Sequence, residues 1–567
     1  MSNKSHLIIA ILSTALTSIS FPTFAKDTPD WSKNVSLAPG ENRQNIFQVT
    51  PEELDSLKNS GYIHAMKYPV SVTGLLIPYR PLTHVYQSDD TNPLKLFLLD
   101  LTSKQFSFSK EELLYQWLGL SKHNGPNATG IYKMPYPNGQ PDQFYVGAGI
   151  VKRGSVDGLT FSCFACHSNN LFGKTVMGLT NKKPHANMLF QIGRMTVPFI
   201  PDDIYKIGTQ SNSEEMALFR RTKQNILAVG GVAPQVHGLD TSLPHTALSL
   251  ARRNLDDYAT KNPYFEAHPR PNELSHFVAD SKPMPWWNLK YKTRWLSDGS
   301  VVSGNPIFTN FLWNEIGRGT DLHELEQWMQ ANIPIIEELT AAVFATEAPR
   351  YTDFFPAESI NLTLAQKGEK LFNETCSRCH GQYEKAWSKD DHLSLSPLEA
   401  LATTKVIYHS KTPVINVGTD PQRAQAMKYF ASNLNELAIS KWMRTTIEPQ
   451  EGYVPPPLVG IWSRYPYFHN GSIPNLCALL TPPDQRPKTF VMGPSINKET
   501  DFSQDCVGYP TGSKIPMEWR KNTDAYYDTR KPGLSNSGHY KMLLDETGKE
   551  KYSTADKKAI IEFLKTL

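Results

Sequence analysis

Apolar residues recur every three or four positions in several stretches of the chain, which is the spacing of a helix with one buried face. The clearest stretch, residues 322–344, predicts one long helix, kinked at Pro334 because proline has no backbone N–H to donate. Shorter stretches at residues 364–372 and 559–567 show the same spacing. These patterns predict a mainly α protein, and the 42 prolines predict long ordered loops between its helices.

A short region with strand character interrupts this pattern. Phe144-Tyr145-Val146 and Ile150-Val151-Lys152 are rich in aromatic and β-branched residues, and they flank Gly147-Ala148-Gly149. A glycine loop that binds a nucleotide needs a longer fingerprint between a strand and a helix, and that fingerprint is missing here. We therefore expect two strands and no nucleotide site.

Two copies of one motif stand out: Cys163-Phe164-Ala165-Cys166-His167 and Cys376-Ser377-Arg378-Cys379-His380. Cys-x-x-Cys-His is the attachment signature of a c-type haem. Its two thiols add to the vinyl groups on one edge of the porphyrin, and its histidine becomes the proximal ligand of the iron. With 6 Cys and 16 His in 567 residues, random placement gives only about 0.002 such motifs per chain. The sequence therefore predicts two covalently bound haem c groups, with His167 and His380 as iron ligands.

Each Cys-x-x-Cys pair has two other interpretations, a zinc site and a redox-active dithiol. Zinc would suit the four cysteines only if they converged. Neither interpretation explains why a histidine directly follows both pairs, so we prefer haem attachment.

The residues around the second motif predict how its haem is held. Gly368 and Phe372 precede Cys376 on the helix predicted at residues 364–372. They are similar to the first helix of cytochrome c folds, where a glycine allows a second helix to cross closely. The expected partner is the last helix, because Ser553-Thr554-Ala555-Asp556 resembles a capping box at its start. The first motif lacks these residues, so we expect a strand or loop to lead into it.

The second axial face of each iron decides its role, since a strong ligand closes that face and an open face admits peroxide or dioxygen. The chain offers four candidates for such a ligand. They are His185, His469, His539 and the sulfur of Met492. Spacing alone does not choose among them.

Four other residues have both structural and functional interpretations. Cys477 and Cys506 complete the six cysteines and are expected to pair as a disulfide in an oxidising compartment. Trp286 and Trp287 are either plain core aromatics or residues of the first haem pocket and of the electron path between the haems.

The beginning of the chain has the pattern of an exported protein. The polar residues 1–4 precede an apolar run at residues 7–16, and the small residues Thr23 and Ala25 follow. This is the three-part pattern of a secretory signal peptide, and the run is shorter than the about 20 residues of a membrane span. We expect residues 1–25 to be removed and the mature protein to be periplasmic or secreted, with no membrane span. The net charge of only +3, without a basic run, gives no reason to expect a nucleic-acid partner.

The mature chain is long enough for several domains. We expect an N-terminal extension at residues 26–140, an N-terminal haem c domain at residues 141–350 and a C-terminal cytochrome c domain at residues 351–567. The expected linker is the proline-flanked stretch at residues 349–356.

Taken together, these residues resemble the bacterial di-haem cytochrome c peroxidase superfamily, with the closest similarity to its rubber-oxygenase-like branch. The resemblance covers most of residues 140–567. It rests on both haem motifs, the stretch at residues 467–472 and the Gly538-His539 loop. Pro285-Trp286-Trp287 and Arg486-Pro487-Lys488 support the branch.

The resemblance implies different roles for the two haems. The C-terminal haem would be ligated by two histidines, with His539 as the second ligand and His469 nearby, and would relay electrons. The N-terminal haem would have His167 as its histidine ligand and an open face lined by aromatics, with Trp286 and Trp287 as candidate catalytic residues. Peroxide or dioxygen would react there, and a small redox protein would donate the electrons.

The alternative function is a non-catalytic di-haem electron carrier. It requires both irons to be closed by strong ligands, and His185 is then the candidate over the first haem.

Overall fold

A computed structural model describes residues 27–87, 91–106, 110–136, 145–239, 242–279, 281–390, 394–522 and 525–567 of the chain. The expected signal peptide at residues 1–25 lies outside these ranges. Helix accounts for 43% of the chain and strand for 10%, so the prediction of a mainly α protein is confirmed at this level.

The part of the chain before residue 350 contributes most of the helices. Its α-helices are α1 (Pro51–Lys67), α2 (Tyr79–Gln87), α3 (Pro93–Phe106), α4 (Glu111–Trp117), α5 (Phe164–His167), α6 (Ala186–Thr196), α7 (Asp202–Thr209), α8 (Ser213–Leu227), α9 (Ser242–Leu250), α10 (Pro263–Ala267), α11 (Pro306–Gly317), α12 (Leu322–Ala331) and α13 (Ile333–Ala345). Its strands are β1 (Ile77–Pro78), β2 (Ala148–Arg153), β3 (Val156–Phe161), β4 (Ser168–Leu171) and β5 (Lys174–Met177).

The remaining part has shorter elements joined by long loops. Its α-helices are α14 (Leu362–Thr375), α15 (Ser377–His380), α16 (Pro397–Ala400), α17 (Gln422–Gln425), α18 (Ala431–Glu436), α19 (Ala438–Trp442), α20 (Leu476–Leu479) and α21 (Thr554–Lys565). Its strands are β6 (Gln382–Lys385), β7 (Thr403–Ile407), β8 (Thr489–Val491) and β9 (Tyr526–Asp528).

All sheets in the described ranges are small and antiparallel. Strands β1, β3 and β2 form a three-stranded sheet in that order, and β4–β5, β6–β7 and β8–β9 are two-stranded. The second of the two predicted strands is therefore confirmed as β2. Of the first, Phe144 lies outside the described residues, and Val146 pairs with Ser121 in an isolated bridge. Strand β3 ends two residues before Cys163, so the expectation that a strand leads into the first motif is also confirmed.

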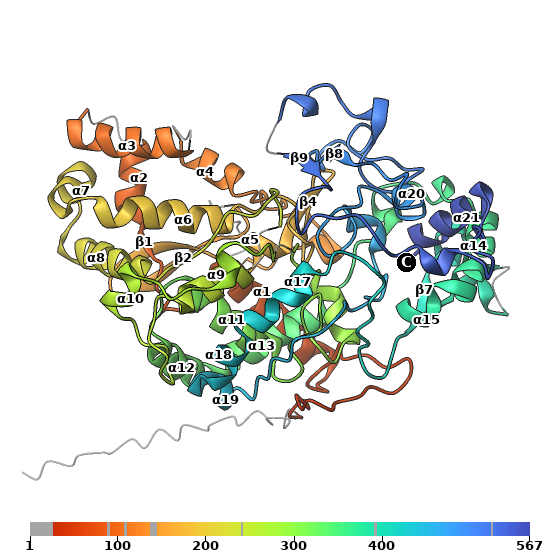
Figure 1. Cartoon of the computed structure of the whole chain (residues 1–567), viewed down its shortest axis with the longest axis horizontal. Helices are drawn as coiled ribbons and strands as arrows, with labels where there is room; N and C mark the ends of the chain where they lie inside the picture. Colours follow the sequence, from red (N-terminus) through yellow and green to blue (C-terminus); the bar gives the residue numbers. More distant parts are fainter. Residues whose placement is uncertain are drawn as a thin grey trace, which may run out of the picture.

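Helices α1 and α13 pack together at the centre of the N-terminal half (Figure 1). A methyl group at Gly61 would lie 2.1 Å from the carbonyl oxygen of Glu338, so only glycine permits this close crossing. The hydroxyl groups of Tyr62 and Thr346 are 3.0 Å apart across the same contact. Residues of the expected N-terminal extension thus belong to the same buried core as the helices that follow.

Two short helices from the second half, α18 and α19, join this core. Helix α19 packs against α12 (Figure 1). The rings of Trp313 and Phe430 meet edge to face at 5.7 Å, and Met427 and Leu434 are buried in the same cluster. Core packing therefore crosses the expected boundaries at residues 140 and 350, and the domain limits stay predictions.

The second motif sits in a separate helical module formed by α14, α15 and α21 (Figure 1). A methyl group at Gly368 would lie 2.0 Å from the carbonyl oxygen of Ala559, and the rings of Phe372 and Phe563 are 5.2 Å apart. Ser553 caps α21 in a capping box with Asp556. The predicted crossing of the first and last helices of this module is therefore confirmed.

The prediction of a single helix at residues 322–344 is wrong. The chain forms α12 and α13 in succession, with Asn332 between them at φ −125° and ψ 33°. Pro334 lies in the first turn of α13, where its missing N–H costs no hydrogen bond. The proline therefore starts a second helix rather than kinking the first one.

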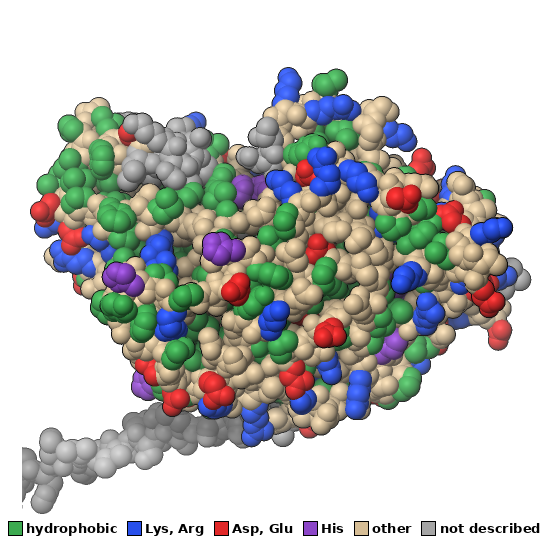
Figure 2. All heavy atoms as spheres, viewed as in Figure 1, with side chains coloured by type: hydrophobic (Ala, Val, Ile, Leu, Met, Phe, Trp, Pro, Cys, Tyr) green, Lys and Arg blue, Asp and Glu red, His purple; other side chains and the backbone are tan. Residues whose placement is uncertain are grey.

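Charged side chains of both signs are interspersed over the face of the molecule drawn in Figure 2. Within the described ranges, no helix is both long and apolar enough to cross a membrane.

Candidate haem sites

The second motif lies against a cavity of about 220 Å³. Helix α14 leads directly into α15, and Cys376, Cys379 and His380 all line the cavity. The Nδ1 of His380 donates to the carbonyl oxygen of Pro456 at 2.8 Å, which leaves Nε2 free to bind a metal. Burial lowers the pKa of His380 to about 4, so the ring is neutral near pH 7, as a metal ligand must be.

His539 faces His380 across this cavity, and the two ring centroids are 6.1 Å apart. Two imidazoles that share one metal through bonds of about 2 Å have centroids roughly 6 Å apart. The observed separation therefore fits an iron held between the two rings. Burial, followed by the proximity of His380 and Arg486, lowers the pKa of His539 to about 3. Of the four candidates for a second ligand, His539 is the one that lies opposite a motif histidine.

The backbone around His539 has an uncommon conformation. Gly538 has φ 77° and His539 has φ 53°, so two successive residues lie in the left-handed region. A methyl group at Gly538 would lie 2.2 Å from the carbonyl carbon of Gly418, so the close approach of these two segments requires glycine. The backbone N–H of His539 donates to the carbonyl oxygen of Val417 at 2.8 Å. Contacts with other segments thus hold the residue in place.

The other candidates near this cavity do not face His380. His469 lines the cavity wall, its ring stacks on Tyr453 at 3.8 Å, and burial lowers its pKa to about 3. Met492 is buried but lines neither of the two cavities described here.

The first motif lies against a second cavity, also of about 220 Å³. Cys163, Cys166 and His167 line it, and the Nδ1 of His167 donates to the carbonyl oxygen of Met284 at 3.0 Å. Burial lowers the pKa of His167 to about 4. Like His380, His167 is neutral and has its Nε2 free to bind a metal.

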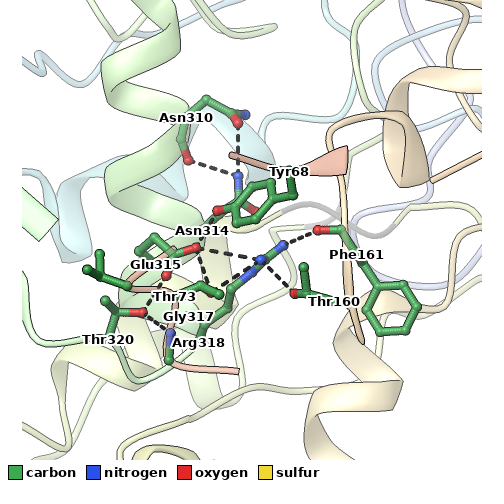
Figure 3. Close-up of polar contacts among 12 residues, drawn as sticks. Tyr68, Thr73, Thr160, Phe161, Asn310, Asn314, Glu315, Gly317, Arg318 and Thr320 are labelled. Carbon is green, nitrogen blue, oxygen red and sulfur yellow. Dashed lines mark hydrogen bonds and ion pairs between the residues drawn. The ribbon is translucent and has the colours of Figure 1, made fainter. Parts of the chain in front are cut away.

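A buried polar cluster holds the strand that leads into Cys163 (Figure 3). Arg318 donates to the carbonyl oxygen of Phe161 at 2.7 Å and to the hydroxyl of Thr160 at 3.2 Å, both on β3. Its guanidinium lies 3.6 Å from the carboxylate of Glu315, which is fully buried and also accepts a hydrogen bond from Tyr68. Arg318 and Tyr68 line the cavity. The cluster ties α11, β3 and the end of α1 together around the first motif.

The N-terminal cavity differs from the C-terminal one in the number of histidines that line it. Among the described residues that line it, His167 is the only histidine. His185, proposed above as a second ligand, lies elsewhere. Its ring stacks between Trp117 at 4.4 Å and His237 at 3.4 Å, and its Nδ1 donates to the carbonyl oxygen of Trp117. The assignment of His185 to the first iron is therefore wrong.

The two neighbouring tryptophans have different surroundings. Trp286 lines the N-terminal cavity, and its ring lies 5.5 Å from that of His167. Trp287 lines neither cavity, because its indole N–H donates to the carbonyl oxygen of Val459 at 2.9 Å within the C-terminal core. The catalytic role of Trp286 stays a prediction. The structure places Trp287 in the buried core and at neither cavity, which favours its structural interpretation.

One segment forms a wall shared by the two cavities. Lys282, Pro283, Met284 and Ser297 line both of them. The ammonium of Lys282 donates to the carbonyl oxygen of Arg464 at 2.9 Å, so the segment is anchored to the C-terminal half. Because the carbonyl of Met284 accepts from His167, this wall also contacts the N-terminal iron ligand.

The thiols do not support the zinc and dithiol interpretations. The two cysteine pairs line different cavities, so the four sulfurs do not form one site. Burial raises the pKa of Cys163 to about 11 and that of Cys376 to about 12, which keeps these thiols protonated near pH 7. A redox-active dithiol has a lowered thiol pKa instead. Two cysteines and a histidine beside a cavity are the arrangement that haem attachment needs.

A disulfide bond joins Cys477 and Cys506 next to the C-terminal cavity. Leu476 and Leu479, on the same short helix as Cys477, line that cavity. The bond therefore fixes part of the cavity wall.

Several residues of these sites carry no signal in the sequence. Tyr68, Glu315 and Arg318 come together although Tyr68 lies more than 240 residues before the other two. Arg486 was noted only as part of a family stretch, yet it contacts the loop that carries His539. Only a three-dimensional arrangement reveals these partners, because no spacing rule links residues so far apart.

The family model described as "RoxA-like, cytochrome c-like" matches residues 452–491. The matched stretch contains Tyr453, His469, Cys477 and Arg486, and it forms much of the wall of the C-terminal cavity. The match supports a relationship of this chain to RoxA-like cytochromes c and, with it, the presence of haem c.

Two curated relatives come from Sinorhizobium fredii (strain NBRC 101917 / NGR234). The chain is 31% identical over 261 residues to the uncharacterized protein y4iJ, which covers 37% of this chain and 39% of that protein. It is 26% identical over 343 residues to the uncharacterized protein y4iM, which covers 57% of this chain and 71% of that protein. The chain thus matches about two fifths of the length of y4iJ, and neither name describes an activity.

Proposed function

We propose that this chain is a periplasmic or secreted di-haem c-type oxidoreductase, in which peroxide or dioxygen reacts at the N-terminal site and the C-terminal site relays electrons. The observation that carries the proposal is the difference between the cavities. One has a histidine on each side, whereas the other has a single histidine among its described lining residues. The relationship to RoxA-like cytochromes c supports haem as the cofactor.

The residues of the C-terminal site fit a closed redox centre. Cys376 and Cys379 would carry the haem, and His380 and His539 would bind its iron from both sides. A haem at each motif would supply one-electron redox chemistry. With both histidines bound to the iron, this site would have no position for a small oxidant, and its role would be to pass electrons.

The residues of the N-terminal site fit a reactive centre. Cys163 and Cys166 would carry the haem, and His167, oriented by the carbonyl of Met284, would bind the iron from one side. Trp286 packs against His167 and excludes water from that side of the cavity. The polar cluster of Arg318 and Glu315 fixes the strand before Cys163 and so keeps the attachment point rigid.

The wall shared by the two cavities supports electron transfer between the sites. Met284 lines both cavities, and its carbonyl is hydrogen-bonded to His167. Electrons from a small redox protein would enter at the C-terminal site and reach the N-terminal site across this short segment. Such a donor is part of the proposal.

The alternative, a non-catalytic electron carrier, requires a strong second ligand at the first iron. His185 was the residue proposed for that role, and its ring is stacked between Trp117 and His237 instead. The alternative has therefore lost its specific support.

A peroxide titration followed by visible absorption tests the proposal. We expect hydrogen peroxide to change the absorbance of one of the two haems and to leave the other unchanged. The substitution Trp286→Phe should alter the rate of that change, whereas Trp287→Phe, the matched control, should not. If neither haem responds to peroxide in the oxidised or the half-reduced protein, nor to dioxygen in the reduced protein, the enzyme proposal is wrong and the electron carrier is favoured.

A further inference from the structure

A single arginine connects the wall of the C-terminal cavity to the loop that carries His539. Arg486 is buried, and its guanidinium is directed toward backbone carbonyl groups. Burying a guanidinium is costly unless its N–H groups are hydrogen-bonded. The hydrogen bonds of Arg486 therefore show which segments it holds together.

The guanidinium contacts two different segments at once. Its Nε donates to the carbonyl oxygens of Ala478 at 3.1 Å and Thr481 at 3.0 Å, and its Nη2 donates to that of Leu479 at 3.2 Å. Ala478 and Leu479 are the last two residues of α20, and Thr481 follows shortly after it. The cysteine of α20 forms the disulfide with Cys506. The α20 segment that Arg486 contacts is therefore held in place by the disulfide.

The remaining nitrogen of the guanidinium holds the ligand loop. The Nη1 of Arg486 donates to the carbonyl oxygen of Gly538 at 3.0 Å and also to that of Asn536. These residues lie one and three positions before His539. The side-chain amide of Asn536 returns a hydrogen bond to the carbonyl oxygen of Pro487 at 2.9 Å, so the contact runs in both directions.

The loop needs such contacts because its conformation is uncommon. His539 has φ 53° and follows Gly538 at φ 77°. A non-glycine residue in the left-handed region is strained, and it persists only where the surrounding structure holds it. Arg486 supplies restraints directly before His539, and the N–H of His539 donates to Val417. Earlier in the same loop, Ser535 and Ser537 donate to Asp420 and to the carbonyl oxygen of Gly418.

From this geometry we infer that Arg486 is a positioning residue that keeps His539 on the C-terminal iron and thereby keeps this haem closed. The inference rests on the proposed pair of ligands, His380 and His539, and it assigns the control of that ligation to a residue outside both motifs. Without the guanidinium, the carbonyls of Asn536 and Gly538 lose their donors, the loop relaxes to an ordinary backbone conformation, and the imidazole of His539 leaves the iron.

The test is electron paramagnetic resonance of the full-length, haem-loaded protein and its variants. In Arg486→Met, the low-spin signal of the C-terminal iron should lose most of its intensity and a high-spin signal should appear. The spectrum should approach that of His539→Ala, and added imidazole should restore the low-spin signal in both variants. A merely structural role would not produce a loss that imidazole repairs.

The matched control is Arg520→Met. Arg520 is exposed and donates to the carbonyl oxygen of Gly512 in the same half of the molecule. This substitution should leave both haem signals as in the wild type. The far-ultraviolet circular dichroism of all variants should also match that of the wild type.

The outcomes separate this inference from the proposed function. If the wild type shows a low-spin C-terminal iron and Arg486→Met keeps it, the inference is overturned and the proposed ligands stand. If the wild type has no such signal, both are overturned. If Arg486→Met does not fold, Arg486→Lys decides, because one ammonium cannot contact α20 and the loop together. A mixture of spin states then supports the inference, and a pure low-spin signal overturns it.

Discussion

The two haem motifs of this chain lie against cavities of the same volume, about 220 Å³ each, yet the cavities are built by different means. The C-terminal cavity lies on the crossing of α14 and α21, is braced by a disulfide, and has His380 and His539 at 6.1 Å across it. The N-terminal cavity lies at the end of a strand, is braced by the buried pair Glu315–Arg318, and has His167 as its only histidine among the described lining residues.

This difference teaches that the attachment motif does not decide what a haem does. Both motifs have two cysteines for haem attachment and one histidine for the iron, and both histidines are oriented by a backbone carbonyl, that of Met284 or that of Pro456. In the proposed function, reactivity depends on the far side of each cavity, which is built from segments distant in the sequence.

Removing His539 should abolish the difference between the two irons. In His539→Ala the C-terminal iron loses its second nitrogen ligand, so its low-spin signal should disappear and the iron should bind added imidazole or cyanide. His469→Ala is the matched control, because His469 is a buried histidine of the same cavity that does not face His380. If both variants keep the low-spin signal, His539 is not the ligand.

Breaking the buried ion pair should disturb the N-terminal site alone. Arg318→Met leaves the fully buried Glu315 without its cation, and removing one partner of such a pair costs about 3–5 kcal/mol of the free energy of unfolding. Urea unfolding followed at the absorbance of each haem should show earlier loss of the N-terminal site. Arg530→Met, which breaks an exposed pair with Asp528, should leave both transitions nearly unchanged.

Removing the disulfide should weaken the C-terminal site by a smaller amount. The bond between Cys477 and Cys506 closes a loop of 29 residues, and a loop of that length contributes about 3 kcal/mol in the chain-entropy model. In the double variant Cys477→Ser/Cys506→Ser, the low-spin signal should be lost at a lower urea concentration while the N-terminal transition stays in place. Equal shifts of both transitions would contradict the separate bracing of the two sites.

Adding a methyl group where α14 and α21 cross should also destabilise the C-terminal site, by less than removal of the disulfide does. A methyl group at Gly368 would lie 2.0 Å from the carbonyl oxygen of Ala559, so Gly368→Ala forces the helices apart at a cost of about 1–3 kcal/mol. Gly125→Ala is the control, because a methyl group there would meet no atom within 4 Å. Thermal unfolding monitored at the C-terminal haem should shift only in the first variant.

Acid should also separate the two sites. Burial lowers the pKa of His469, which is not a proposed iron ligand, to about 3. The unfolded chain takes up a proton on this ring near pH 6.5, about its reference value, whereas the folded protein does not. The contribution of His469 to stability is therefore complete above about pH 6.5 and is lost as the pH falls toward 3. Of the two cavities, His469 lines only the C-terminal one, so the low-spin signal should be lost first in an acid titration.

The sequence predicts the parts of this contrast that depend on local spacing. The two motifs, the capping box at Ser553 and the glycine of the Gly368 crossing are all visible in the chain, because each depends on residues a few positions apart. The mainly α class also follows from helical spacing.

The sequence does not predict the other features of the two sites. They depend on contacts between distant residues or on the local helix type. Trp286 and Trp287 are adjacent in a short 3₁₀ helix, where successive side chains point about 120° apart, so one faces the cavity and the other the core. His185 lies close to the first motif in sequence, yet its stacking on Trp117 and His237 removes it from the iron. Arg486 gains its role only from a loop that begins 50 residues later.

Electron paramagnetic resonance of the protein as isolated, repeated after half-reduction and after addition of peroxide, tests the central claim most directly. The account predicts two different irons: a low-spin iron that ignores peroxide, held by His380 and His539, and an iron held by His167 that is high-spin or responds to peroxide. Two low-spin irons that remain indifferent to peroxide in every redox state would contradict it, since both cavities would then be closed.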